Sequence, residues 1–183
     1  MSEPTLHASL CSLAGGNMDA LDAIYRLTCK KVYAVALSVT HNRYDAEDVM
    51  QDTYAKLCDS VAKYTRGDNP EAWVCMIARN VAYDLLRKQK NDLPLDESVY
   101  TIPAESEDAT VQDAYHALMP ILERCLSAEE REILLLHTVG GMKHTQIAKA
   151  VGKPYATVRW VYANALKKVK KEVEGRRGVN EAQ

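Results

Sequence analysis

The stretch KHTQIAKAVGKPYATVRWVYANALKKVKK, residues 143–171, carries the strongest local signal in this sequence of 183 residues. It predicts two short helices that cross steeply. Small Ala148 suits the helix contact, and Gly152, four residues later, suits a tight turn that needs positive φ. Val158, six residues after the glycine, then faces the first helix. This spacing is typical of a helix-turn-helix.

The second predicted helix has an apolar side and a polar side. In a helix-turn-helix, the polar side meets the major groove of DNA. Arg159 and Asn164 suit base edges there, and Trp160 suits a thymine methyl group or a sugar. The residues predicted to bind DNA are Lys153, Tyr155, Thr157, Arg159, Trp160, Asn164 and Lys167. The alternative is an ordinary helical hairpin with a solvated basic face. The stretch has eight Lys and Arg and no acid, which favours a polyanion as partner.

Charge is distributed unevenly along the chain. The formal net charge of −2 and the sequence pI of about 6.2 argue against a nucleic-acid partner when the chain is taken whole. However, residues 1–90 are neutral, residues 91–125 carry −7, and residues 126–183 carry +5. The segment 91–110 is rich in Asp, Glu, Ser and Pro, which predicts a flexible acidic linker between two domains. An alternative role for its charge is to limit polyanion binding by the basic part.

The rest of the chain predicts helices, because apolar residues recur at helical spacing and strand-like alternation is missing. Asp45 is the predicted N-cap of one helix, and Asn69-Pro70-Glu71 predicts the start of another. Ser127 and Glu130 form a capping-box pattern, and Pro120 predicts a break or kink in the helix that contains it. The expected fold class is all-α.

The sequence lacks the patterns of common enzymes and metal sites. No HExxH, GxGxxG or P-loop pattern occurs, so neither catalysis nor a cofactor is predicted. The five histidines are scattered and predicted to be surface or structural residues, and the five cysteines lack zinc spacing. Unclustered cysteines in odd number fit reduced thiols in a cytoplasm. The sequence has neither a signal peptide nor eighteen consecutive apolar residues, so no membrane insertion is predicted.

Three stretches together resemble a bacterial sigma factor of the sigma-70 family, of the small extracytoplasmic-function (ECF) type. They are YDAEDVMQDTYAKL at 44–57, NPEAWVCMIARNVAYDLLRK at 69–88, and the segment 126–171 that contains the helix-turn-helix. The resemblance extends over about residues 21–173, in the family's order. It implies two small helical domains, sigma region 2 and sigma region 4, joined by the flexible acidic linker. The implied boundaries are a tail at 1–20, region 2 at 21–90, the linker at 91–110, region 4 at 111–175 and a tail at 176–183. Neither tail suggests more than disorder or fraying.

The resemblance also implies partners and site residues. Asp48, Gln51 and Asp52 are implied to dock on the β′ clamp helices of core RNA polymerase, and their spacing places them on one exposed helix face. The loop at 64–69 is implied to hold a flipped promoter base. Trp73 suits either the core or DNA. The residues implied to bind the −10 element are Arg66, Arg79, Asn80, Arg87 and Lys88. Region 4 is implied to read the −35 element, and an anti-sigma protein is an implied regulator.

Some positions depart from the family's pattern. Lys143 stands where the family often has Ser or Thr, and Val161, Ala163 and Asn164 stand where it often has basic residues. Because this recognition helix is poorer in arginine, either the −35 sequence or the strength of its contact is expected to differ from what is usual in the family. Two other functions stay open from the sequence. One is a dimeric helix-turn-helix regulator that acts without polymerase, and the other is a sigma-like protein that binds polymerase but no promoter.

Overall fold

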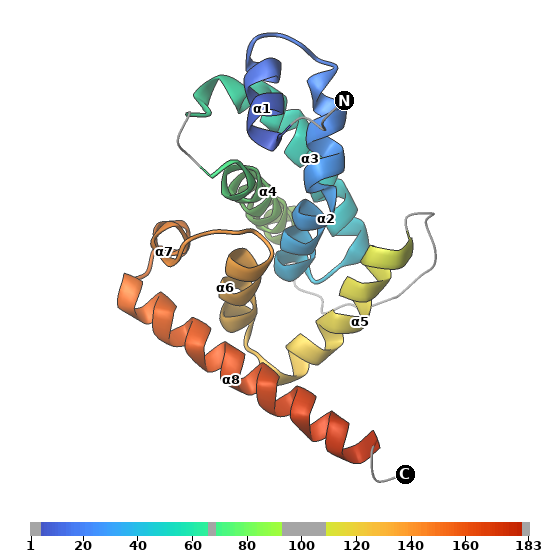
Figure 1. Ribbon diagram of the computed structural model, residues 1–183, viewed down its shortest axis with the longest axis vertical. Coiled ribbons are helices and arrows are strands. Elements are labelled where there is room, and N and C mark those ends of the chain that lie inside the picture. Colours follow the sequence, from blue (N-terminus) through green and yellow to red (C-terminus); the bar gives the residue numbers. More distant parts are fainter. Residues whose placement is uncertain (1–4, 66–68, 93–108, 181–183) are drawn as a thin grey trace. The chain divides into compact units, whose positions relative to one another are not determined.

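The computed structural model describes residues 5–65, 69–92 and 109–180, and these residues form helices without any strand (Figure 1). The all-α prediction is therefore confirmed for the described part. The chain divides into two compact units, the first with α1 to α4 and the second with α5 to α8. Residues 93–108 of the predicted acidic linker lie outside the described residues. No helix within the described ranges is long and apolar enough to cross a membrane.

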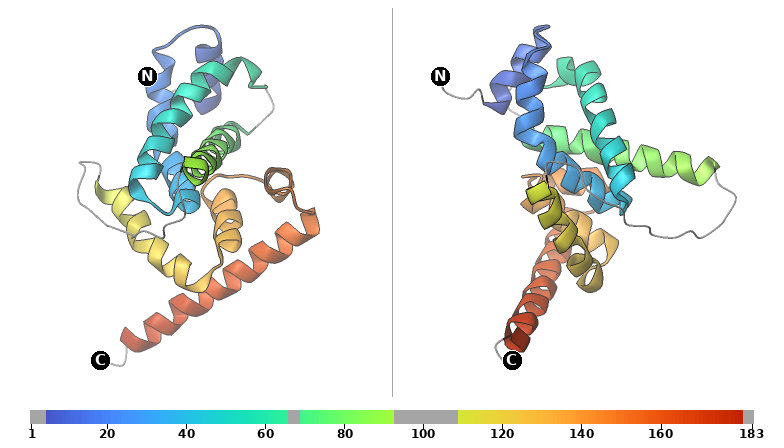
Figure 2. Two further views of the ribbon diagram at one scale, coloured as in Figure 1. Left: turned by 180° about the vertical axis from the view of Figure 1, so that it is seen from behind. Right: turned by 90° about the vertical axis from the view of Figure 1, so that its right-hand side faces the viewer.

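The first unit is built around α2, Ala20–Thr40, which packs beside α3, Arg43–Ser60, and α4, Pro70–Asp92 (Figures 1 and 2). Each helix turns one apolar face inward. The side chains of Val35, Leu57 and Val74 are fully buried in this core. A short 3-10 turn, η1, Val61–Lys63, follows α3 directly. The helices are held by this shared core, because most of the stability of a helix in a protein comes from the packing of its apolar face.

The first twenty residues contain a helix that the sequence did not predict. Helix α1 covers Leu6–Ala14, and the Thr5 hydroxyl caps it by accepting a hydrogen bond from the Ala8 N–H at 3.3 Å. Leu6, Leu10 and Leu13 recur at helical spacing and are buried. The expectation of disorder was therefore wrong for this segment. The signals of a capping threonine and a leucine face were present but short, and they fell outside the recognised motifs.

The start of α3 differs from the prediction by three residues. The cap is Asn42 rather than Asp45, since the Asn42 side chain accepts from the Tyr44 N–H at 2.9 Å and the Asp45 N–H at 3.5 Å. His41 ends α2 in the left-handed region with φ 56°, so the chain reverses within two residues. By contrast, Asn69 caps α4 as predicted, accepting from the Glu71 and Ala72 N–H groups.

The second unit begins with α5, Ala109–Cys125, which continues through Pro120, so the predicted break is not found. Met119 and Leu122, which precede and follow the proline in the sequence, are buried. Burial of these apolar side chains stabilises the helix against the loss of one hydrogen bond at Pro120. Helix α6, Ala128–Thr138, starts with the predicted capping box, because the Ser127 N–H donates to Glu130 Oε2 at 3.0 Å and the Glu130 N–H donates to Ser127 Oγ at 3.3 Å.

The helix-turn-helix is formed by α7, His144–Val151, and α8, Tyr155–Asn180. Gly152 ends α7 with φ 67°, which confirms the predicted need for a glycine. Ile147 and Val158 are fully buried where the two helices meet. Helix α8 extends past the predicted boundary at 175, so that part of the predicted tail is helical.

Lys143 lacks the capping hydroxyl that the family often has before α7. Here the Gln146 side chain compensates, since its Oε1 accepts a hydrogen bond from the Lys143 backbone N–H at 2.9 Å. This is the glutamine half of a capping box. The start of α7 therefore keeps one capping hydrogen bond, although Lys143 has no hydroxyl group.

The assignment of the α3 cap can be tested by substitution. Asn42→Ala should lower the free energy of unfolding by about 1 kcal/mol, because two N–H groups at the helix start lose their acceptor. Asn42→Asp, which keeps an acceptor oxygen, should retain most of the stability. Urea unfolding measures both. If Asp45→Ala had the larger effect and Asn42→Ala none, Asp45 would be the cap.

Candidate functional site

An acidic strip lies on the outer face of α3. Asp48, Gln51 and Asp52 are all exposed, whereas Val49 and Thr53 beside them are buried. Side chains at i, i+3 and i+4 share one face of a helix. The structure thus brings the three residues together on one exposed face of α3.

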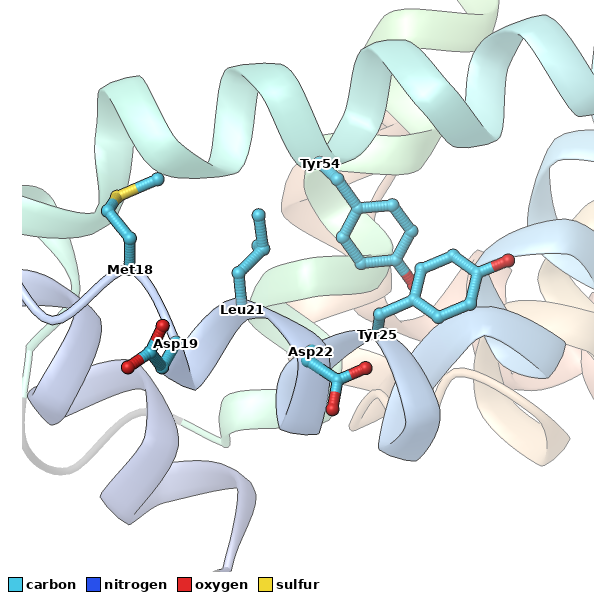
Figure 3. Close-up of a pocket in the computed structure, with 6 residues that line it drawn as sticks. All are labelled: Met18, Asp19, Leu21, Asp22, Tyr25 and Tyr54. Carbon is cyan, nitrogen blue, oxygen red and sulfur yellow. The ribbon is translucent and has the colours of Figure 1, made fainter.

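An apolar groove adjoins the acidic strip, and it was not predicted from the sequence. It has a volume of about 540 Å³ and lies between the start of α2 and the middle of α3 (Figure 3). The residues that line it are Met18, Asp19, Leu21, Asp22, Tyr25 and Tyr54. Met18 is 60% exposed, and the rings of Tyr25 and Tyr54 lie 5.0 Å apart between centroids. Tyr54 follows Gln51 by three residues, so the groove and the strip meet along α3.

Helix α4 carries the residues expected at the −10 element. Arg79, Asn80 and Arg87 lie on one side of the helix, away from buried Val74 and Ala78. The Arg79 guanidinium lies 4.5 Å from the centroid of the Tyr83 ring. Arg87 pairs with Asp84, and Lys88 is exposed further round the helix. Arg66, the remaining residue of this set, lies outside the described residues.

Helix α8 presents the residues expected at the −35 element. Its exposed face carries Arg159, Lys167 and Trp160, the last of which is 66% exposed. Tyr155 is also exposed and lies under the Arg159 guanidinium at 5.8 Å from the ring centroid. Thr157 and Asn164 are half-buried at the edge of this face. The burial of Val158 and Val161 on the other side fixes this orientation.

Two lysines of the basic segment are paired with acids of α6. Lys153 Nζ lies 2.6 Å from Glu129 Oε2, and Lys168 Nζ lies 2.7 Å from Glu130 Oε1. The hydrogen bond from Lys168 holds the pKa of Glu130 below its usual range. Such partly exposed pairs contribute little stability, so a phosphate group can replace the carboxylate at small cost.

Three rings, one each from α6, α7 and α8, contact one another in the second unit. The imidazoles of His137 and His144 stack at 4.3 Å, and both meet the edge of the Tyr162 ring, at 4.6 Å and 4.8 Å. His137 Nδ1–H donates to the Met142 carbonyl at 2.7 Å. The buried His144 Nε2 has no hydrogen-bond partner within the described part of the chain. The scattered histidines of the sequence thus include a structural pair, which only the fold could reveal.

The surroundings of His144 in this histidine pair lower its pKa. Burial lowers the pKa of His144 below its ordinary 6.5, and the charges of His137 and Arg159 lower it further. The folded chain therefore binds a proton at His144 less readily than the unfolded chain does. Because the unfolded state gains more protons below pH 6.5, this group makes the free energy of unfolding fall as the pH drops through that range.

NMR titration of the full chain tests this environment. The imidazole signals of His144 should shift with a midpoint below pH 6.5, and Arg159→Gln should raise that midpoint by removing a nearby cation. Lys171→Gln removes one charge elsewhere on α8 and should leave the midpoint unchanged. A His144 midpoint at or above 6.5 in the unaltered chain would contradict the buried arrangement.

Comparison with known proteins finds two family profiles that match this chain. The profile described as Sigma-70 region 2 matches residues 24–91, which include α3 and most of α2 and α4. The profile described as Sigma-70, region 4 matches residues 124–169, which include α6, α7 and the first part of α8. Together the two profiles cover more than half of the chain.

Curated relatives are themselves sigma factors. The probable RNA polymerase sigma factor RfaY of Xanthomonas campestris pv. campestris is 27% identical over 92% of this chain and 44% of its own length. The ECF RNA polymerase sigma factor SigE of Mycolicibacterium smegmatis is 29% identical over 78% of this chain and 57% of its own length. The chain thus spans about half the length of these two relatives.

Solved structures share the fold. The sigma factor RpoE, in complex with the anti-sigma factor NepR from Bartonella quintana, matches with a TM-score of 0.59 and 27% identity over 82% of this chain and 94% of RpoE. CnrH, in complex with the cytosolic domain of CnrY, matches in fold with a TM-score of 0.63 and 19% identity over 92% of this chain and 97% of CnrH. Sigma factors are non-catalytic transcription initiation factors, so the prediction that the chain is not an enzyme is confirmed. With both profiles in the family's order, the chain belongs to the sigma-70 family of RNA polymerase sigma factors, in its ECF group.

Proposed function

We propose that this chain binds core RNA polymerase and directs transcription from promoters with a −10 and a −35 element. The observation that carries the proposal is the division of surfaces between the two units. The first unit presents the acidic strip of α3, and the second presents the basic, aromatic face of α8. An adaptor between a protein and DNA needs both kinds of surface.

The acidic strip and the apolar groove are the proposed docking surface for the β′ clamp helices. Asp48, Gln51 and Asp52 supply exposed polar groups on one helix face. The groove beside them supplies exposed Met18 and Tyr25. Stable interfaces combine an apolar, aromatic centre with a polar rim. This pairing supports protein binding better than a strip of acids by itself would.

The polar side of α4 is proposed to contact the −10 element. Arg79 and Arg87 offer cations for the DNA backbone, and Asn80 offers an exposed amide between them. Arg66 and Lys88 complete the proposed set. The segment 64–69 is proposed to hold the flipped base, and its two ends, Tyr64 and Asn69, lie within the described residues.

The exposed face of α8 is proposed to enter the major groove at the −35 element. Arg159 is proposed to pair with a base edge, and exposed Trp160 is proposed to pack on a thymine methyl group or a sugar. Tyr155, Thr157 and Asn164 border this contact. Lys153 and Lys167 are proposed to bind phosphates. The proposal thus relies on one arginine where the family often has several basic residues.

An anti-sigma protein is the proposed regulator. Two structures with the same fold were solved as complexes, RpoE with the anti-sigma factor NepR and CnrH with the cytosolic domain of CnrY. A chain that acts on RNA polymerase works in the bacterial cytoplasm, where such a partner can occupy its polymerase-binding surfaces and keep it inactive.

Transcription in vitro tests the proposed function directly. Purified core polymerase with this chain should initiate at defined start sites on promoters selected by the reconstituted complex, and core polymerase without it should not. Sequencing the bound DNA would give both elements. If the chain bound core polymerase but selected no promoter, a sigma-like interaction protein would be indicated. Tight promoter binding without polymerase would indicate a stand-alone regulator.

The docking surface has a test of its own. Asp48→Arg combined with Gln51→Ala should weaken core affinity at least tenfold, because it places a cation where the partner is expected to carry one. Circular dichroism should show a retained helical fold, since both side chains are exposed. Glu174→Arg makes the same change in net charge on exposed α8 and should leave core affinity intact. Equal core affinity for all three proteins would remove the docking assignment.

A further inference from the structure

Helix α1 contacts the residue that opens the proposed base-holding segment. His7 Nδ1 and the Tyr64 hydroxyl lie 2.8 Å apart in hydrogen-bonding contact, although 57 residues separate them in the sequence. Their rings meet edge-on with centroids 5.7 Å apart. The His7 ring is held at its other nitrogen as well, since Nε2 lies 3.7 Å from Cys11 Sγ, one turn along α1.

Tyr64 in turn contacts the start of α4. Its ring lies 5.3 Å from that of Trp73, centroid to centroid, at 58°. The Tyr64 backbone N–H also donates to the Val61 carbonyl at 3.0 Å, which ends η1. The contact between the Tyr64 and Trp73 rings therefore links the end of η1 to the first turn of α4. The three rings of His7, Tyr64 and Trp73 form a continuous row, which we call the ring row.

The ring row begins on α1, which is anchored in the core of the first unit. Leu10 is fully buried and Leu6 and Leu13 nearly so, which anchors α1 in the first unit and places His7 independently of DNA. All three rings of the row are half-buried, so their remaining surface faces solvent. A polar contact between an anchored helix and a partly exposed aromatic ring restricts the orientation of that ring. The orientation of the Tyr64 ring beside Trp73 is then restricted before any base arrives.

We infer that His7 is a positioning residue for promoter opening and that α1 belongs to the DNA-melting machinery of this chain. The inference rests on the proposed function. Capture of an unstacked base costs unpairing energy and needs side chains that receive the base. Fixing the orientation of the Tyr64 ring in advance removes part of the entropic cost at the moment of capture. His7 acts on DNA only through Tyr64 and needs no contact with a base.

The experiment measures promoter opening by the complete chain with core polymerase. Permanganate reactivity of thymines in the −10 region follows opening on a duplex promoter and on the same promoter with a premelted −10 bubble. His7→Ala should slow opening of the duplex about three- to tenfold, the range expected for one hydrogen bond. On the premelted promoter the defect should shrink below about twofold, because melting no longer limits the reaction.

Three further variants separate positioning from a structural role. His7→Asn keeps a hydrogen-bonding group near the place of Nδ1 and should restore most of the rate. Tyr64→Phe removes the hydroxyl and keeps the ring, so adding His7→Ala to it should cause no further loss. Ser12→Ala is the matched control on α1, because it removes a hydrogen bond of 3.1 Å from Asn17 without touching the ring row.

Each outcome decides the inference. Normal duplex opening by His7→Ala overturns it, as does an equal defect on duplex and premelted DNA, or a loss of core affinity that accounts for the slower rate. An additive effect of His7→Ala and Tyr64→Phe overturns the route through Tyr64. If the unaltered chain itself gives no start-site-specific transcript, the proposed function fails and the inference falls with it. Failure of the inference alone leaves the unaltered chain active.

Discussion

Each helix of this protein has to bury one face to be stable, and only the opposite face is left for a partner. In α3, burial of Val49 and Leu57 forces Asp48 and Gln51 outward. In α8, burial of Val158 does the same for Trp160. The positions of the proposed binding surfaces on α3 and α8 are therefore consequences of core packing.

Much of the fold follows from local patterns. The helix-turn-helix was predictable because Gly152 is needed at one backbone position, and the α4 cap because Asn69 precedes a proline. What escaped prediction depends on contacts between distant residues. His7 meets Tyr64 only when the first unit has folded, and the groove needs both α2 and α3. The misplaced α3 cap shows a local limit, since Asn42 and Asp45 suit the same role equally well by residue type.

Net charge describes the second unit less well than the arrangement of its charges does. Acids of α6 reach Lys153 and Lys168, so part of the basic excess is already paired. Arg159 and Lys167 remain on the exposed face of α8, beside the uncharged ring of Trp160. Recognition by this face would depend as much on shape and apolar contact as on attraction to phosphate. Helix α8 thus has few arginines on this face, and it exposes the indole of Trp160 there.

The outer face of α8 also bears on how such proteins diverge. Arg159 and Trp160 contribute almost nothing to the core, so substitutions there change stability little. Duplicated genes can therefore acquire a different surface chemistry at these positions by single exchanges while the scaffold stays intact. Relatives at 27% and 29% identity have room for many such exchanges. A scaffold that separates packing from surface chemistry in this way lets related chains diverge on one helix face without loss of the fold.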